Sequence, residues 1–214
     1  MDVPDNTCVL YLIRHGATIS NIAKPPILQG RGVNHGLSEV GCAQAERTAA
    51  FLAEQKIDAV FSSPLLRAQE TAAAIAARHR LSVNLVDALV EADVGRWEGK
   101  TWADVARLEP ELHRQFMADC GTTGYGGGEN FREVLERVTP AINAIAAAHP
   151  GKQVVVVGHN VVNRAYLSGV LHVPLAKSRA IVQDNCGVTI LHILHGETRV
   201  VTLNATFHLD GTRT

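Results

Sequence analysis

Five ionisable side chains stand just beyond predicted strands of this 214-residue chain. They are Arg14 and His15 after residues 7–13, Arg67 after residues 57–61, Glu91 after residues 81–86 and His159 after residues 153–157. The carboxyl ends of parallel strands meet at one edge of an open α/β sheet, so we expect these side chains to converge. Guanidinium forks match the oxygens of a phosphate dianion. The set therefore indicates a catalytic site for a phosphate ester.

Residues next to these side chains are candidates for binding the substrate: Gly16, Thr18, Asn21 and Asn160. Gly16 follows His15 directly, and a residue without a side chain there would let a phosphate approach. Asn160 lies at the predicted start of a helix, where backbone N–H groups favour anions. The GxxxxGK[ST] and GxSxG patterns are absent, which argues against a nucleotide P-loop and a serine hydrolase.

The elements that must position these residues alternate along the chain. Short apolar runs predict the four strands named above, and a hairpin is predicted over residues 187–194 and 198–203. Helices are predicted over residues 38–54, 64–80, 102–118, 131–149 and 161–170, the third broken near Pro110. We therefore expect residues 1–214 to form a single three-layer α/β/α domain. Its central sheet would be mostly parallel, with helices on both faces and a C-terminal hairpin.

Composition narrows the classes of partner. With 20 Lys+Arg against 21 Asp+Glu, the chain has no electrostatic footprint for nucleic acid or an anionic membrane. It has no predicted signal peptide and no apolar stretch of about 18 residues, so we expect a cytoplasmic protein.

The four cysteines lie far apart, without metal-ligand spacing, and are expected to be reduced. His192 and His195 are three apart in the predicted hairpin, on opposite faces of a strand. We expect no metal ion and no cofactor.

The ordered motifs resemble the histidine phosphatase superfamily, in its phosphoglycerate mutase-like branch, over about residues 8–209. They are R-H-G-x-T-x-x-N at 14–21, L-S-x-x-G-x-x-Q-A at 37–45, S-S-P-L-x-R-A-x-x-T-A at 62–72, Glu91 with G-x-W-E-G at 95–99, G-G-E at 127–129, V-G-H at 157–159, and Asn204 with His208-Leu209. The resemblance implies a phosphoglycerate mutase-like fold with His15 as the nucleophile. It implies that Arg14, Arg67 and His159 bind the phosphoryl oxygens with support from Asn21. Glu91 would be the general acid and then the general base.

Within that family, the short middle segment and the G-x-W-E-G run resemble phosphatases, with a small phosphate ester as partner. A cofactor-dependent phosphoglycerate mutase is the alternative, and a non-catalytic phosphate-binding module on the same fold is a second one. Asn160 stands where the family often has glycine, and Gly36 where it has proline.

Residues 19–36 and 93–128 would form the rim of the site and set the substrate, which stays open. Candidates for contacting the rest of the substrate are Lys24, Arg31, Arg96, Lys100, Arg114 and Tyr125. The oligomeric state, monomer or homodimer, also stays open.

Overall fold

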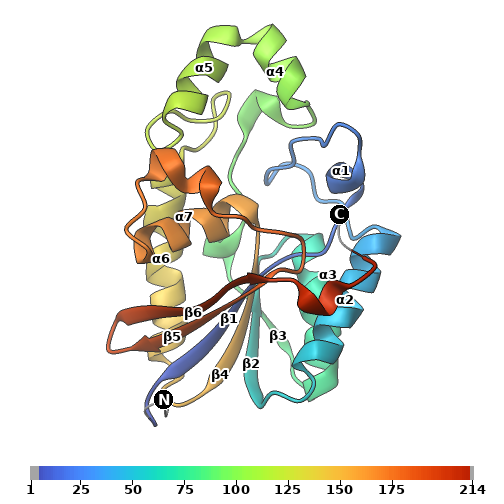
Figure 1. The fold of residues 1–214 in the computed structure, drawn as a ribbon, viewed down its shortest axis with the longest axis vertical. Helices are drawn as coiled ribbons and strands as arrows, with labels where there is room; N and C mark the ends of the chain where they lie inside the picture. The colour runs from blue at the N-terminus through green and yellow to red at the C-terminus, as the bar shows by residue number, and fades with distance from the viewer. Residues whose placement is uncertain (1–4, 213–214) are drawn as a thin grey trace.

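A six-stranded sheet forms the centre of the computed structural model, which describes residues 5–212 (Figure 1). Its strand order is β3-β2-β4-β1-β5-β6. The parallel strands are β1 (Cys8–Arg14), β2 (Ile57–Ser62), β3 (Val83–Leu85) and β4 (Gln153–Gly158). The antiparallel hairpin β5 (Val188–Leu194) and β6 (Glu197–Ala205) extends the sheet beside β1. The predicted mostly parallel sheet with a C-terminal hairpin is confirmed.

The two central strands are apolar on both faces because helices cover both sides. Alternate residues point to opposite faces of a strand, and Val154 and Val156 of β4 join one core cluster while Val155 and Val157 join the other. All four valines are fully buried. A run of valines without polar alternation is typical of a parallel strand buried on both faces.

Helices pack in pairs on the two faces of the sheet (Figure 1). One pair is α2 (Glu39–Leu52) and α3 (Leu66–His79), and the other is α6 (Phe131–Ala147) and α7 (Asn160–Val170). Ser38 caps α2 as predicted, since its hydroxyl accepts a hydrogen bond from the Gly41 N–H at 3.1 Å. α3 begins at Leu66, two residues after the predicted start.

The lid consists of α4 (Trp102–Leu108) and α5 (Pro110–Ala118), which stand beyond the carboxyl ends of the parallel strands (Figure 1). Pro110 separates them as predicted, since proline suits the first turn of a helix but not its interior. Aromatic side chains pack beneath the lid around the fully buried Trp97. This core fixes the lid to the domain.

Short helices complete the fold. They are α1 (Ile19–Ile22) and the 3₁₀ turns η1 (Asp87–Leu89), η2 (Gly95–Trp97), η3 (Leu175–Ala180) and η4 (Phe207–Leu209). The sequence predicts none of them, because segments this short carry no periodic pattern. Among the helices of residues 5–212, none combines the length and apolar character needed to cross a membrane.

Candidate active site

His15 lies directly after β1 with its imidazole almost fully buried. Its Nδ1 is 2.7 Å from the carbonyl oxygen of Gly16. A carbonyl oxygen only accepts, so Nδ1 carries the ring proton in this contact. Burial, together with the nearby Arg67 and Arg14 guanidinium groups, holds the pKa of His15 well below its ordinary value. The ring is therefore neutral at pH 7, and Nε2 presents a lone pair suited to nucleophilic attack.

Arg67 and Arg14 are the two cations around that imidazole. Arg67 is fully buried near the start of α3, and its Nε is 3.3 Å from His15 Nε2. The Arg67 Nη1 and Nη2 atoms donate to the Val33 and Gly30 carbonyl oxygens at 2.9 and 3.0 Å. Burial lowers the pKa of Arg14 to about 10, which leaves it charged at pH 7.

His159 is the N-cap residue of α7 and is fully buried beside His15, with ring centroids 5.0 Å apart. Its Nε2 lies 2.7 Å from the Ser63 hydroxyl oxygen. Burial, with Arg67 and then His15 nearby, holds the pKa of His159 well below its ordinary value. Ser63 orients this ring, a role that the sequence analysis missed although Ser63 lies in the 62–72 motif.

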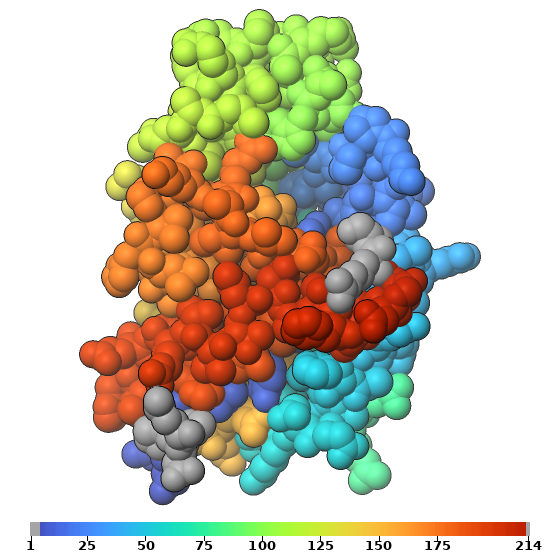
Figure 2. All heavy atoms as spheres, viewed as in Figure 1, coloured from blue at the N-terminus to red at the C-terminus, as the bar shows by residue number. Residues whose placement is uncertain are grey.

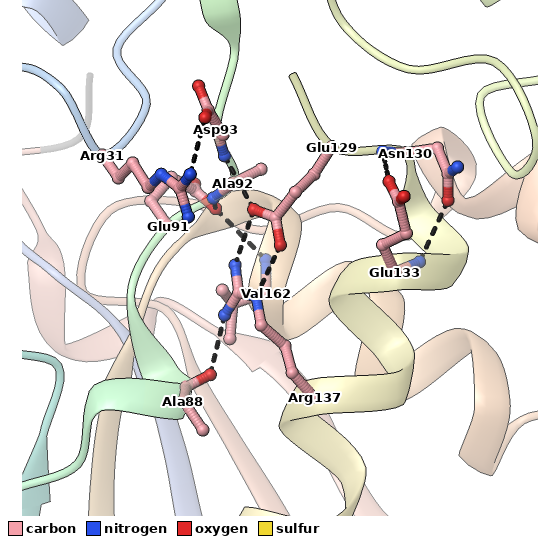
Figure 3. Close-up of polar contacts among 10 residues, drawn as sticks. All are labelled: Arg31, Ala88, Glu91, Ala92, Asp93, Glu129, Asn130, Glu133, Arg137 and Val162. Atoms are coloured by element: carbon pink, nitrogen blue, oxygen red, sulfur yellow. Dashed lines mark hydrogen bonds and ion pairs between the residues drawn. The ribbon is translucent and has the colours of Figure 1, made fainter. Parts of the chain in front are cut away.

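Glu91 is buried against the first turn of α7 (Figure 3). One carboxylate oxygen accepts hydrogen bonds from the Ala92 and Val162 N–H groups at 2.8 and 3.3 Å. The other accepts from the Val161 N–H at 3.1 Å. We expected backbone N–H groups at this helix start to favour a phosphate, and two of them, at Val161 and Val162, bind Glu91. The helix start positions this carboxylate instead.

A second polar cluster fixes the segment that carries Glu91 (Figure 3). Arg137 of α6 forms an ion pair with Glu129 at 2.8 Å and donates to the Ala88 carbonyl oxygen at 2.7 Å. Glu129 also accepts a hydrogen bond from the Asp93 N–H at 2.8 Å. The chain is therefore held on both sides of Glu91. Only tertiary structure brings these groups together, so sequence reasoning missed Arg137.

Gly16 is required by a close contact between the segment after β1 and α2. A Cβ on Gly16 would lie 2.6 Å from the Gly41 carbonyl oxygen. The Gly16 N–H donates to the Thr71 hydroxyl at 3.0 Å. This packing gives a different reason for the glycine than the phosphate access that we expected.

Thr18 and Asn21 belong to the turn that carries α1. The Asn21 side-chain oxygen accepts from the Thr18 N–H at 3.0 Å, and the Thr18 hydroxyl lies 2.7 Å from the Gln29 side-chain oxygen. Thr18 is fully buried and does not line the cavity described next, whereas Asn21 does. Thr18 therefore stabilises the turn that carries α1.

A cavity of about 200 Å³ opens over His15. In Figure 2 the surface is hollowed below the lid, between the blue segment that carries α1 and the orange segment of α7 and η3. Predicted residues that line the cavity are Arg14, His15, Asn21, Glu91, Asn160 and Tyr125. Arg67 and His159 do not line the cavity themselves and lie beside His15. The cavity is thus built around the predicted nucleophile.

Most candidates for contacting the rest of the substrate do not line this cavity. Arg31, Arg96 and Arg114 are ion-paired with Asp93, Glu109 and Glu111, Lys100 donates to the Arg96 carbonyl oxygen, and Lys24 is exposed. Arg164 and Arg179 line it instead. The spacing of residues in the sequence did not indicate either arginine, because Arg164 follows the first turn of α7 and Arg179 lies in η3, away from the ends of the strands.

Several buried polar atoms around the cavity have no hydrogen-bond partner within residues 5–212. They are Arg14 Nε, Gln29 Nε2, His159 Nδ1 and Asn160 Oδ1. Buried polar groups are normally paired, so these atoms fit a polar ligand. No group of three His, Cys, Asp or Glu side chains in the described part of the chain is placed to hold a metal ion.

Comparison with known proteins establishes the family. Residues 10–206 match the profile of the histidine phosphatase superfamily (branch 1), and the chain belongs to this superfamily. Phosphoserine phosphatase 1 of Hydrogenobacter thermophilus is 32% identical over 201 residues, which cover 94% of this chain and 93% of that protein. The structure of a mycobacterial glucosyl-3-phosphoglycerate phosphatase matches with a TM-score of 0.83 and 27% identity, covering 94% of this chain and 100% of that one. The predicted membership is confirmed.

A bifunctional protein of Mycobacterium tuberculosis is 44% identical over 151 residues, which cover 70% of this chain. The match spans only 40% of the length of that protein.

Proposed function

We propose that this chain is a phosphatase that hydrolyses a small phosphate ester through a phosphorylated His15. The observation that carries the proposal is the neutral imidazole at the cavity, with Nδ1 committed to the Gly16 carbonyl oxygen and Nε2 beside Arg67. Relatives named as phosphatases support the reaction class.

In the first step, His15 Nε2 attacks phosphorus and the bond from phosphorus to the ester oxygen breaks. The departing oxygen takes a proton from the Glu91 carboxyl group. In the second step, the Glu91 carboxylate takes a proton from water as the water oxygen attacks phosphorus and the bond from Nε2 to phosphorus breaks. Phosphate leaves, and His15 and Glu91 return to their starting states.

The cations act mainly by electrostatics. Phosphoryl transfer needs in-line positioning and stabilisation of charge on the equatorial oxygens. Arg67 is held by two carbonyl oxygens and is already desolvated, so its guanidinium is preorganised, and its Nε–H releases His15 Nε2 as that atom attacks phosphorus. The unpartnered Arg14 Nε and His159 Nδ1 are the further groups proposed to bind its oxygens.

The test is a rapid quench with a ³²P-labelled phosphate ester. Label should appear on a peptide containing His15 with the acid-labile, base-stable behaviour of phosphohistidine. His15→Ala should abolish label and turnover, while His79→Ala, at the far end of α3, should change neither. Turnover by His15→Ala near that of the unmodified chain would refute the mechanism. Absence of turnover for every ester would favour the non-catalytic binding module.

A mutase is separated from a phosphatase by its product. With 3-phosphoglycerate and a trace of 2,3-bisphosphoglycerate, a mutase would isomerise much faster than it released phosphate. We expect phosphate release to dominate for the best ester. Fast interconversion of the phosphoglycerates with little free phosphate would favour the mutase.

A further inference from the structure

Arg164 presents unused hydrogen-bond donors to the cavity. It lies one helical turn after Asn160 on α7, and both residues line the cavity. Its Nε donates to the Ile181 carbonyl oxygen at 2.8 Å, which fixes the guanidinium plane. Its terminal nitrogens have no hydrogen-bond partner among residues 5–212. A fixed guanidinium with a free fork is suited to bind an anion in bidentate fashion.

Arg179 reaches the same cavity from η3. Its guanidinium carbon lies 5.1 Å from the ring centroid of Trp102, the first residue of the lid helix α4. Stacking on an indole ring positions a cation without neutralising its charge. Arg179 therefore brings a second positive charge to the wall formed by Arg164.

Neither cation forms an ion pair with a carboxylate in the described part of the chain. Six other arginines do form ion pairs: Arg31, Arg78, Arg96, Arg107, Arg114 and Arg137. Burial lowers the pKa of Arg164, and the nearby positive charge of Arg179 acts in the same direction, whereas Tyr125 and Glu91 act in the opposite direction. Two unpaired cations on one partly buried wall repel each other, and a bound anion would relieve this cost.

This wall comes from other parts of the fold than the groups assigned to the transferred phosphoryl. Those groups lie at the ends of β1 and β4 and at the starts of α3 and α7, whereas Arg164 and Arg179 come from the second turn of α7 and from η3. The cavity volume of about 200 Å³ is below the range of about 300–1,000 Å³ typical of sites for drug-sized ligands. A compact substrate would therefore extend from the phosphoryl site to the wall.

We propose that Arg164 and Arg179 form a subsite for a second anionic group of the substrate, a carboxylate or a second phosphate. The substrate class is then a short phosphate ester that carries another negative charge. This inference rests on the proposed function, because it assigns the part of the substrate beyond the ester oxygen.

The test compares esters that differ in one anionic group. 3-Phosphoglycerate and glycerol 3-phosphate differ only in a carboxylate against a hydroxymethyl group, and fructose 1,6-bisphosphate and fructose 6-phosphate differ in a second phosphate. In at least one pair, the doubly anionic ester should have the higher kcat/KM. Arg164→Gln and Arg179→Gln should each lower that value by about 10- to 100-fold, the effect of losing a charged hydrogen bond. The singly anionic ester should change less than about threefold, because it lacks the group that these arginines bind.

Arg107→Gln is the matched control, since Arg107 is an exposed lid arginine paired with Asp104 and does not line the cavity. This substitution should leave kcat/KM unchanged for both esters of each pair. If Arg164→Gln fails to fold, the exposed Arg179 carries the test, and Arg164→Lys should recover part of the preference.

Binding to His15→Ala, measured by calorimetry with the same esters, gives a readout independent of turnover. Weaker binding of the doubly anionic ester after either arginine substitution supports the subsite even if no ester is hydrolysed. Equal effects of the substitutions on both members of each pair, in binding and in kcat/KM, would overturn the inference. Turnover with equal effects would refute the subsite alone, whereas preferential binding without turnover would refute the proposed function alone.

Discussion

Replacing Glu91 with glutamine tests both its proposed proton transfer and its contact with α7. Glutamine keeps the shape of the side chain but has one oxygen and one NH₂ group where glutamate has two acceptor oxygens. It cannot donate a proton as a carboxylic acid does. The variant therefore has separate expected effects on stability and on catalysis.

The effect on stability follows from three hydrogen bonds. If the glutamine oxygen takes the place of the glutamate oxygen with two contacts, it keeps the hydrogen bonds from the Ala92 and Val162 N–H groups. The glutamine NH₂ then faces the Val161 N–H, whose nitrogen is 3.1 Å from the other glutamate oxygen. One hydrogen bond is lost and a buried donor is left unpaired, which costs about 1–3 kcal/mol. Urea unfolding should show this loss of unfolding free energy, and an unchanged stability would contradict the contact with α7.

The effect on catalysis depends on the leaving group. An alkoxide is a poor leaving group and needs a proton as the bond breaks, and a positioned acid contributes about 10²–10⁴ in rate. p-Nitrophenolate is stable and gains little. Glu91→Gln should therefore lower kcat/KM for glycerol 3-phosphate by about 10²–10⁴ and for p-nitrophenyl phosphate by less than about tenfold.

Arg67→Ala is the control, because Arg67 is proposed to bind the phosphoryl group that both esters share. It should lower kcat/KM for the two esters by similar factors. The value of kcat/KM is the right measure, since it covers the steps through phosphorylation of His15 and excludes the later attack by water. Equal losses for both esters in Glu91→Gln would remove Glu91 as the proton donor.

Three further predictions concern the buried histidines, a tight glycine contact and the rim. Because the pKa values of His15 and His159 lie well below 6.5, the unfolded chain binds more protons than the folded one as the pH falls below 6.5. The free energy of unfolding therefore falls toward pH 5 by about 1.4 kcal/mol per pH unit for each histidine. In urea unfolding measured at several pH values, His159→Gln should remove about half of the pH dependence that the two histidines cause. An unchanged slope would contradict a neutral, buried His159. Gly41→Ala would place a Cβ 2.0 Å from a backbone carbonyl oxygen in the segment after His15, and should lower the unfolding free energy by about 2 kcal/mol or more. Gly169→Ala in α7, which meets only the end of a leucine at 3.2 Å, should cost much less, and equal losses would refute the contact. Asn160→Gly removes a half-buried amide whose oxygen has no hydrogen-bond partner in the described part of the chain. It should raise KM for the best alkyl ester by about tenfold, the effect of one hydrogen bond, while KM for p-nitrophenyl phosphate stays within about twofold. If the variant and the unmodified chain had the same KM for the alkyl ester, Asn160 would not contact the leaving group.

The sequence was sufficient for the sheet and for the residues that gather at its edge. Valine-rich runs such as residues 153–157 specify strands locally, and the residue after a strand is fixed at its carboxyl end whatever the rest of the chain does. His15 and His159 were predicted to be neighbours on that basis alone, and their rings lie 5.0 Å apart. The phosphate chemistry followed from the same positions, because arginine and histidine have few other uses together at such an edge.

Tertiary structure decided which charges remain available to a substrate. Arg96 is a promising cation in the sequence, yet it is ion-paired with Glu109 thirteen residues away in the lid. Arg164 was not singled out in the sequence analysis, yet its free donors line the cavity. Whether a carboxylate neutralises an arginine depends on how distant segments pack, and local pattern does not encode that packing. The sequence thus determined which side chains gather at the sheet edge, whereas the packing of the lid, α7 and η3 determined the shape and charge of the space around them.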